Sequence, residues 1–75
     1  MNTAAKLIDA MINNPLDWRI DQLQTVAQRH GVIWRSEGGS HFAFIRQDGR
    51  ALVIPARRPI RAVYVRKFVQ FIQRE

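Results

Sequence analysis

Residues 32–55 read VIWRSEGGSHFAFIRQDGRALVIP, three short apolar runs separated by two turn sequences. The first turn contains the pair Gly38-Gly39, and the second contains Asp48-Gly49, a dipeptide typical of tight hairpins. The β-branched and aromatic residues that fill the runs favour extended backbone over helix. Two hairpins in succession predict an antiparallel meander of three strands, at residues 32–35, 40–46 and 51–54.

Helical periodicity replaces the strand pattern on both sides of this segment. Before it, apolar residues recur at helical spacing through residues 3–12 and again through residues 19–30, with Asp17 as the expected N-cap of the second helix. After it, residues 60–73 carry an apolar stripe at i, i+3, i+4 and i+7. The fold class is therefore expected to be α+β, with helices packed on one face of the sheet and the other face open.

The 75 residues provide length for a single domain, residues 1–75. We expect residues 17–75 to form its core, and residues 1–16 to form an N-terminal extension helix added outside the minimal core. In a domain this small, a few large apolar side chains must supply much of the stability. The expected ones are Trp18, Trp34, Phe42, Phe44, Phe68 and Phe71.

The middle strand places a histidine at a position from which it can act on a ligand. Side chains alternate between the faces of a strand, so Phe42 and Phe44 share one face while His41, Ala43 and Ile45 share the other. If the phenylalanines face the helices, His41 stands on the open face. Histidine can take and give a proton near neutral pH, which makes His41 a candidate for chemistry on a phosphate backbone. The alternative is a strand histidine that only hydrogen-bonds the turn.

Basic residues are concentrated in one half of the chain. There are 12 basic and 6 acidic residues, a formal net charge of +6. Residues 1–34 are balanced, so the excess lies entirely within residues 35–75. Ten of the basic residues are arginines, whose planar guanidinium groups bind phosphate and stack on bases. This pattern favours a nucleic-acid-binding face, and the alternatives are an ordinary basic surface or a patch for an acidic protein partner.

Several classes of protein are excluded or unsupported by the composition. The chain has no cysteine, which excludes disulfides, thiolate catalysis and cysteine-ligated metals. The two histidines and scattered carboxylates show no metal-ligand spacing, so we expect neither a metal site nor a cofactor. No nucleophile-elbow sequence is present, so a Ser/His/Asp hydrolase is unsupported. No signal peptide or bilayer-length apolar run is visible, so we expect a soluble, cytoplasmic protein without membrane contact.

The order of these elements and their short motifs resembles the HicA family (YcfA-like proteins) of bacterial toxins. The resemblance spans about Ile20 to Ile72: a helix ending in His30-Gly31, the motif Gly39-Ser40-His41, an Asp-Gly hairpin, and Val53-Ile54-Pro55 before a closing amphipathic helix. These toxins are mRNA interferases of type II toxin–antitoxin systems. The resemblance implies an α-β-β-β-α fold similar to the double-stranded-RNA-binding domain, metal-independent cleavage of mRNA, and inhibition by a HicB-like antitoxin protein.

The resemblance also implies roles for particular residues. The family's catalytic histidine falls on His41, which we expect to act as the general acid or base. A second histidine often follows the third strand in the family, but this chain has Ala56-Arg57-Arg58 there, so arginine is expected to contact phosphate instead. Gly39 is expected to give backbone access and Ser40 to donate a hydrogen bond. The candidates for holding phosphate near the start of the last helix are Arg57, Arg58 and Arg61.

Other conspicuous side chains have ordinary structural explanations. His30 lies in the last turn of a predicted helix, where it meets the carbonyl end of the dipole. Arg66, Lys67 and Arg74 are expected to form the solvent-facing side of the last helix. At the level of function, two alternatives to a toxin ribonuclease remain: a non-catalytic RNA- or DNA-binding module, and a protein-interaction subunit with an acidic partner.

Overall fold

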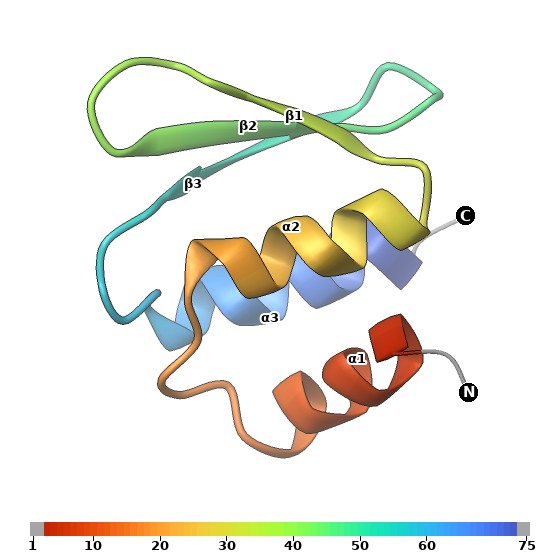
Figure 1. The fold of residues 1–75 in the computed structure, drawn as a ribbon, viewed down its shortest axis with the longest axis vertical. Coiled ribbons are helices and arrows are strands. Elements are labelled where there is room, and N and C mark those ends of the chain that lie inside the picture. Colours follow the sequence, from red (N-terminus) through yellow and green to blue (C-terminus); the bar gives the residue numbers. More distant parts are fainter. Residues whose placement is uncertain (1–2, 74–75) are drawn as a thin grey trace.

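The computed structural model describes residues 3–73 and shows an α+β fold with a three-stranded antiparallel sheet (Figure 1). The order of elements is that of the double-stranded-RNA-binding domain with one additional N-terminal helix, as predicted. The elements are α1 (Thr3–Asn13), α2 (Ile20–Arg29), β1 (Ile33–Ser36), β2 (His41–Ile45), β3 (Ala51–Pro55) and α3 (Ala62–Gln73). Within residues 3–73, no helix has the length and apolar character that a membrane crossing requires.

The sheet has the strand order β1-β2-β3, and its register confirms the predicted alternation. Phe44 lies opposite Trp34 on β1 and opposite Leu52 on β3, and its side chain is completely buried. On the other face, the small Ala43 is only 3% exposed, but its partner Val53 is 46% exposed and Ile33 of β1 is 65% exposed. The phenylalanine face of β2 is therefore the core face, and the face that carries His41 is open.

Three layers are stacked in the molecule (Figure 1). The sheet forms one outer layer, α2 and α3 form the middle layer, and α1 lies against these two helices on the side away from the sheet. Ile8 and Met11 of α1 are buried in the same hydrophobic cluster as Phe44 and Phe68. The first helix is an addition to the α-β-β-β-α order, and its apolar residues share the buried cluster of that core. The two central helices have apolar residues on both sides, and α1 covers the second side.

The start of α2 differs from the sequence prediction. Arg19, rather than Asp17, is the N-cap residue, and its backbone N–H donates to Oε1 of Gln22 over 2.9 Å. Asp17 instead adopts a left-handed backbone conformation with φ of 65°. Asp17 therefore lies in the short linker between α1 and α2, where its backbone turns next to the buried Trp18, and it does not cap α2.

Trp18 connects this linker to the loop that precedes α3. Its indole Nε1–H donates to the carbonyl of Asn14 over 2.7 Å, and its own carbonyl accepts from the backbone N–H of Ile60 over 2.7 Å. Ile60 is 1% exposed, so the bridge lies inside the core. Because Ile60 is used in this extended bridge, α3 begins at Ala62 and not at residue 60 as predicted. The bridge fixes the position of the loop between β3 and α3, which carries Arg57 and Arg61.

Candidate nucleic-acid interface

His41 is the first residue of β2, immediately after the glycine turn. Its backbone N–H donates to the carbonyl of Gly38 over 3.3 Å, and its carbonyl accepts from the N–H of Glu37 over 2.9 Å. The residue is exposed, and its imidazole has no hydrogen-bond partner within residues 3–73. The backbone of His41 thus fixes the turn while its side chain stays free, which does not fit the alternative of a histidine side chain engaged by the turn.

A pocket of about 360 Å³ lies at this end of the sheet, and we call it the His41 pocket. It is formed where β2 begins, β3 ends and the loop into α3 passes, because His41 is paired with Pro55 and the Ala56 N–H donates to the carbonyl of Ser40. Its lining residues are His41, Pro55, Arg57, Arg61 and Tyr64. The fold therefore brings the predicted histidine together with two of the three predicted arginines.

Within residues 3–73, no carboxylate lies close enough to pair with the arginines of this pocket. Arg57 and Arg61 are exposed, and neither has a carboxylate within ion-pair distance in the described part of the chain. The acidic partners in the four ion pairs found there are Asp21, Glu37 and Asp48, and none of these pairs includes Arg57 or Arg61. Between Asp48 and Glu75 the sequence has seven basic residues and no acidic one. The pocket therefore presents two guanidinium groups to an anionic ligand.

The other predicted site residues lie outside the pocket lining. Arg58 is exposed and does not line the pocket, although its neighbour Arg57 does. Gly39 has φ of 57°, and a Cβ added there would meet nothing within 4 Å, so the glycine serves the turn conformation rather than a close approach. Ser40 contributes its carbonyl to the bond with Ala56, and its hydroxyl forms no hydrogen bond within residues 3–73.

Tyr64 is the pocket residue that sequence reasoning missed. It is half-buried on the first turn of α3 and follows Arg61 by three positions, which places both on one side of the helix. The ammonium of Lys67, one turn further, lies 5.8 Å from the centre of the tyrosine ring. The i, i+3, i+6 spacing of Arg61, Tyr64 and Lys67 is visible in the sequence. Whether these side chains line a pocket, however, depends on which side of α3 faces the edge of β3.

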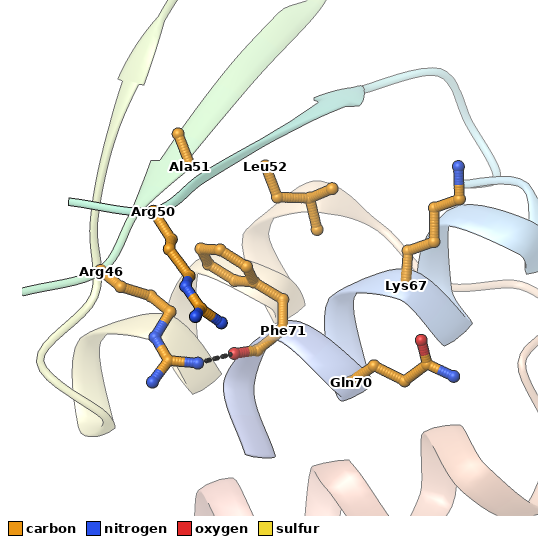
Figure 2. Close-up of a pocket in the computed structure, with 7 residues that line it drawn as sticks. All are labelled: Arg46, Arg50, Ala51, Leu52, Lys67, Gln70 and Phe71. Carbon is orange, nitrogen blue, oxygen red and sulfur yellow. Dashed lines mark hydrogen bonds between the residues drawn. The ribbon is translucent and has the colours of Figure 1, made fainter. Parts of the chain in front are cut away.

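A second pocket with basic walls lies further along β3 and α3 (Figure 2). Lys67 is exposed on the solvent-facing side of α3, as the sequence predicted, and it also lines this pocket. Arg66 is exposed on another side of α3, beside α1, and Arg74 lies outside the described residues. The second pocket is lined by Arg46, Arg50, Ala51, Leu52, Lys67, Gln70 and Phe71.

In the range 3–73, no three metal-ligating side chains come together. Comparison with known proteins returned no match, whether with family models, with curated proteins or with solved structures. The resemblance to HicA toxins therefore rests on the motifs of the sequence, and a topology of this kind does not by itself define an activity.

Proposed function

We propose that this protein is a toxin ribonuclease that cleaves mRNA at the His41 pocket. The observation that supports the proposal is that His41, whose imidazole has no hydrogen-bond partner within residues 3–73, lines the same pocket as Arg57 and Arg61, which have no carboxylate partner there. The proposal places the protein in the cytoplasm, where its substrate is. It also includes a HicB-like antitoxin that inhibits the toxin by covering His41 and the basic surface around it.

The proposed reaction is an internal transesterification of RNA. The 2′-oxygen attacks the adjacent phosphorus and loses its proton, the bond from phosphorus to the 5′-oxygen breaks, and the departing 5′-oxygen gains a proton. The products are a 2′,3′-cyclic phosphate and a 5′-hydroxyl, so no metal or external oxidant is consumed. His41 carries one of the two proton transfers, and water or the Tyr64 hydroxyl carries the other.

Arg57 and Arg61 have a separate role in this mechanism. Negative charge increases on the non-bridging phosphate oxygens as the fifth bond to phosphorus forms. Guanidinium groups already positioned around the pocket stabilise that charge more in the transition state than in the ground state. The arginines thus contribute both to binding of the substrate and to the rate of the chemical step.

The test is cleavage of a single-stranded RNA by the purified protein in the presence of a chelator. We expect fragments that end in a 2′,3′-cyclic phosphate, because the 2′-oxygen is the nucleophile. Binding of RNA without cleavage would support the non-catalytic module instead and contradict the enzymatic proposal. RNA affinity that does not decrease with salt would contradict both the ribonuclease and the non-catalytic RNA-binding module, since phosphate contacts release counterions.

Replacing Arg57 and Arg61 together by glutamine is expected to weaken RNA binding and to flatten its salt dependence. For a single strand, removing one phosphate–cation interaction lowers the slope of log affinity against log salt by about 0.7. Fluorescence anisotropy with a labelled oligonucleotide over a salt series measures both quantities. Lys6→Gln with Arg66→Gln is the matched control, because both residues are exposed and lie on or beside α1. An equal effect of the two double variants would show that only total charge matters.

A further inference from the structure

We infer that the groove between β3 and α3 carries a single RNA strand from the His41 pocket to the second basic pocket. This inference rests on the proposed function for the identity of the ligand as RNA. It adds a second binding site, named here the Arg50 pocket and lined by Arg46, Arg50, Leu52, Lys67 and Phe71 among others, with a volume of about 360 Å³.

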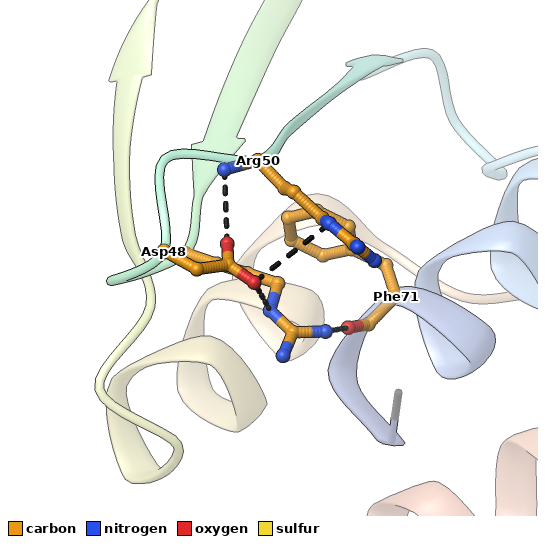
Figure 3. A network of polar contacts seen from close by, with 4 residues as sticks. Asp48, Arg50 and Phe71 are labelled. Carbon is orange, nitrogen blue, oxygen red and sulfur yellow. Dashed lines mark hydrogen bonds and ion pairs between the residues drawn. The ribbon is translucent and has the colours of Figure 1, made fainter. Parts of the chain in front are cut away.

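One wall of the Arg50 pocket is the fixed side chain of Arg46 (Figure 2). Figure 3 shows the contacts that Asp48, which also pairs with Arg46, makes with Arg50. Nη1 of Arg46 donates to the carbonyl of Phe71 over 2.8 Å, and its Nε lies 3.6 Å from Oδ2 of Asp48. The guanidinium carbon is 5.8 Å from the centre of the Phe71 ring, and the side chain is only 17% exposed. Arg46 therefore joins the β2–β3 turn to the end of α3 and holds the ring of Phe71 in place.

The remaining cations of this pocket are available to a ligand. The Arg50 side chain is 58% exposed, and its Nε lies 3.8 Å from the same carboxylate oxygen of Asp48 that Arg46 contacts. One carboxylate thus serves two guanidinium groups. Lys67 adds a third cation that has no carboxylate partner within residues 3–73. Figure 2 shows Lys67 and Arg50 extending from α3 and from the start of β3 on either side of the pocket.

The two pockets lie along the same pair of elements. Pro55 at the end of β3 lines the His41 pocket, whereas Ala51 and Leu52 at its start line the Arg50 pocket. On α3 the order is reversed: the first turn lines the His41 pocket and the last turns line the Arg50 pocket. β3 is an edge strand, so no further strand of the described chain covers this side of the sheet. The two pockets therefore lie one after the other along two antiparallel elements, and the proposed groove is the path between them.

The length and composition of the groove favour an extended polyanion with bases. From Arg61 to Phe71 the helical rise amounts to about 15 Å, more than a single phosphate group can bridge. Each pocket combines cations with an aromatic ring, Tyr64 in one and Phe71 in the other. Aromatic rings that stack on bases, together with cations that follow the backbone, are the usual means of binding single strands. The contact of Lys67 with the Tyr64 ring links the two pockets.

Binding of a 2′-O-methyl RNA oligonucleotide tests this inference independently of cleavage, because such a strand has no free 2′-hydroxyl to attack. Arg50→Gln with Lys67→Gln is expected to weaken binding roughly tenfold, the effect of two exposed charge pairs. The salt slope is expected to fall by about 1.4, twice the value for one phosphate contact. The matched control, Lys6→Gln with Arg66→Gln, removes the same charges from outside the groove and is expected to bind like the wild type.

Equal losses in the two double variants, or no loss in the Arg50 and Lys67 variant, would overturn the inference. Lys67→Glu gives a second measurement that leaves the contacts of Asp48 intact, and it is expected to weaken binding as well. If polyglutamate displaced the oligonucleotide as well as unlabelled RNA does, the groove would be a site for an acidic protein and the inference would be wrong. Failure of the proposed function would appear separately, as absence of cleavage of natural RNA with the groove-specific loss of binding retained.

Discussion

Replacing His41 by glutamine is expected to slow RNA cleavage by about 10²–10⁴-fold, the usual contribution of one general acid or base. The side chain is exposed and its imidazole has no hydrogen-bond partner within residues 3–73, so the stability of the fold is expected to change by less than about 0.5 kcal/mol. The rate is measured with an RNA that carries a fluorophore and a quencher at its ends. Expression of the wild-type chain is expected to arrest bacterial growth, and expression of the variant is expected to leave growth unaffected.

His30→Gln is the matched control for this experiment. His30 is the other histidine of the chain, exposed at the end of α2 and absent from the lining of the His41 pocket. The His30→Gln variant is expected to retain the full rate of cleavage. Cleavage by the His41 variant at the wild-type rate, or an equal loss in both variants, would remove the support for a general acid or base at His41.

Replacing Phe44 by alanine is expected to destabilise the protein by about 3–5 kcal/mol, the usual cost of removing a buried phenyl ring. The ring is completely buried and meets Phe68 of α3 edge-on, with 5.2 Å between ring centres. It also lies 6.3 Å from the ring of Trp34 on β1. A domain of this length has a total stability of roughly 4–11 kcal/mol, so a large fraction of the variant is expected to be unfolded.

Urea denaturation followed by circular dichroism measures this loss. Val53→Ala is the control, because Val53 lies on the open face of the same sheet and its side chain is 46% exposed. The control is expected to lose less than about 1 kcal/mol, since little apolar surface leaves water at that position. Similar losses for the two variants would mean that the helices do not pack on the Phe44 face.

The elements of the fold could be predicted because local sequence determines them. Asp48-Gly49 defines the second hairpin, and the alternation from His41 to Ile45 assigns the core face of β2 without knowledge of the rest of the chain. The helices follow from apolar periodicity in the same way. The nature of the open face, and the position of His41 on it, were therefore accessible from the sequence.

The composition of the His41 pocket could be predicted only in part, because it depends on contacts between distant segments. Arg57 and Arg58 are adjacent in sequence, and only the path of the loop toward the Trp18–Ile60 bridge decides that Arg57 lines the pocket and Arg58 does not. The inclusion of Tyr64 likewise depends on how α3 is rotated about its axis. The packing of α1 on α2 and α3 could not be predicted for the same reason, because apolar residues on the second side of a helix do not reveal which element covers them.

The bridge between Trp18 and Ile60 has a consequence for the thermodynamics of binding. Because the amide of Ile60 is bonded inside the core, the loop that presents Arg57 and Arg61 is anchored at one end before any ligand arrives. A loop fixed in this way loses less conformational entropy on association than a free one, so more of the interaction energy appears as affinity. Exchange of the Ile60 amide with deuterated solvent is accordingly expected to require opening of the core, whereas neighbouring loop amides exchange through local fluctuations.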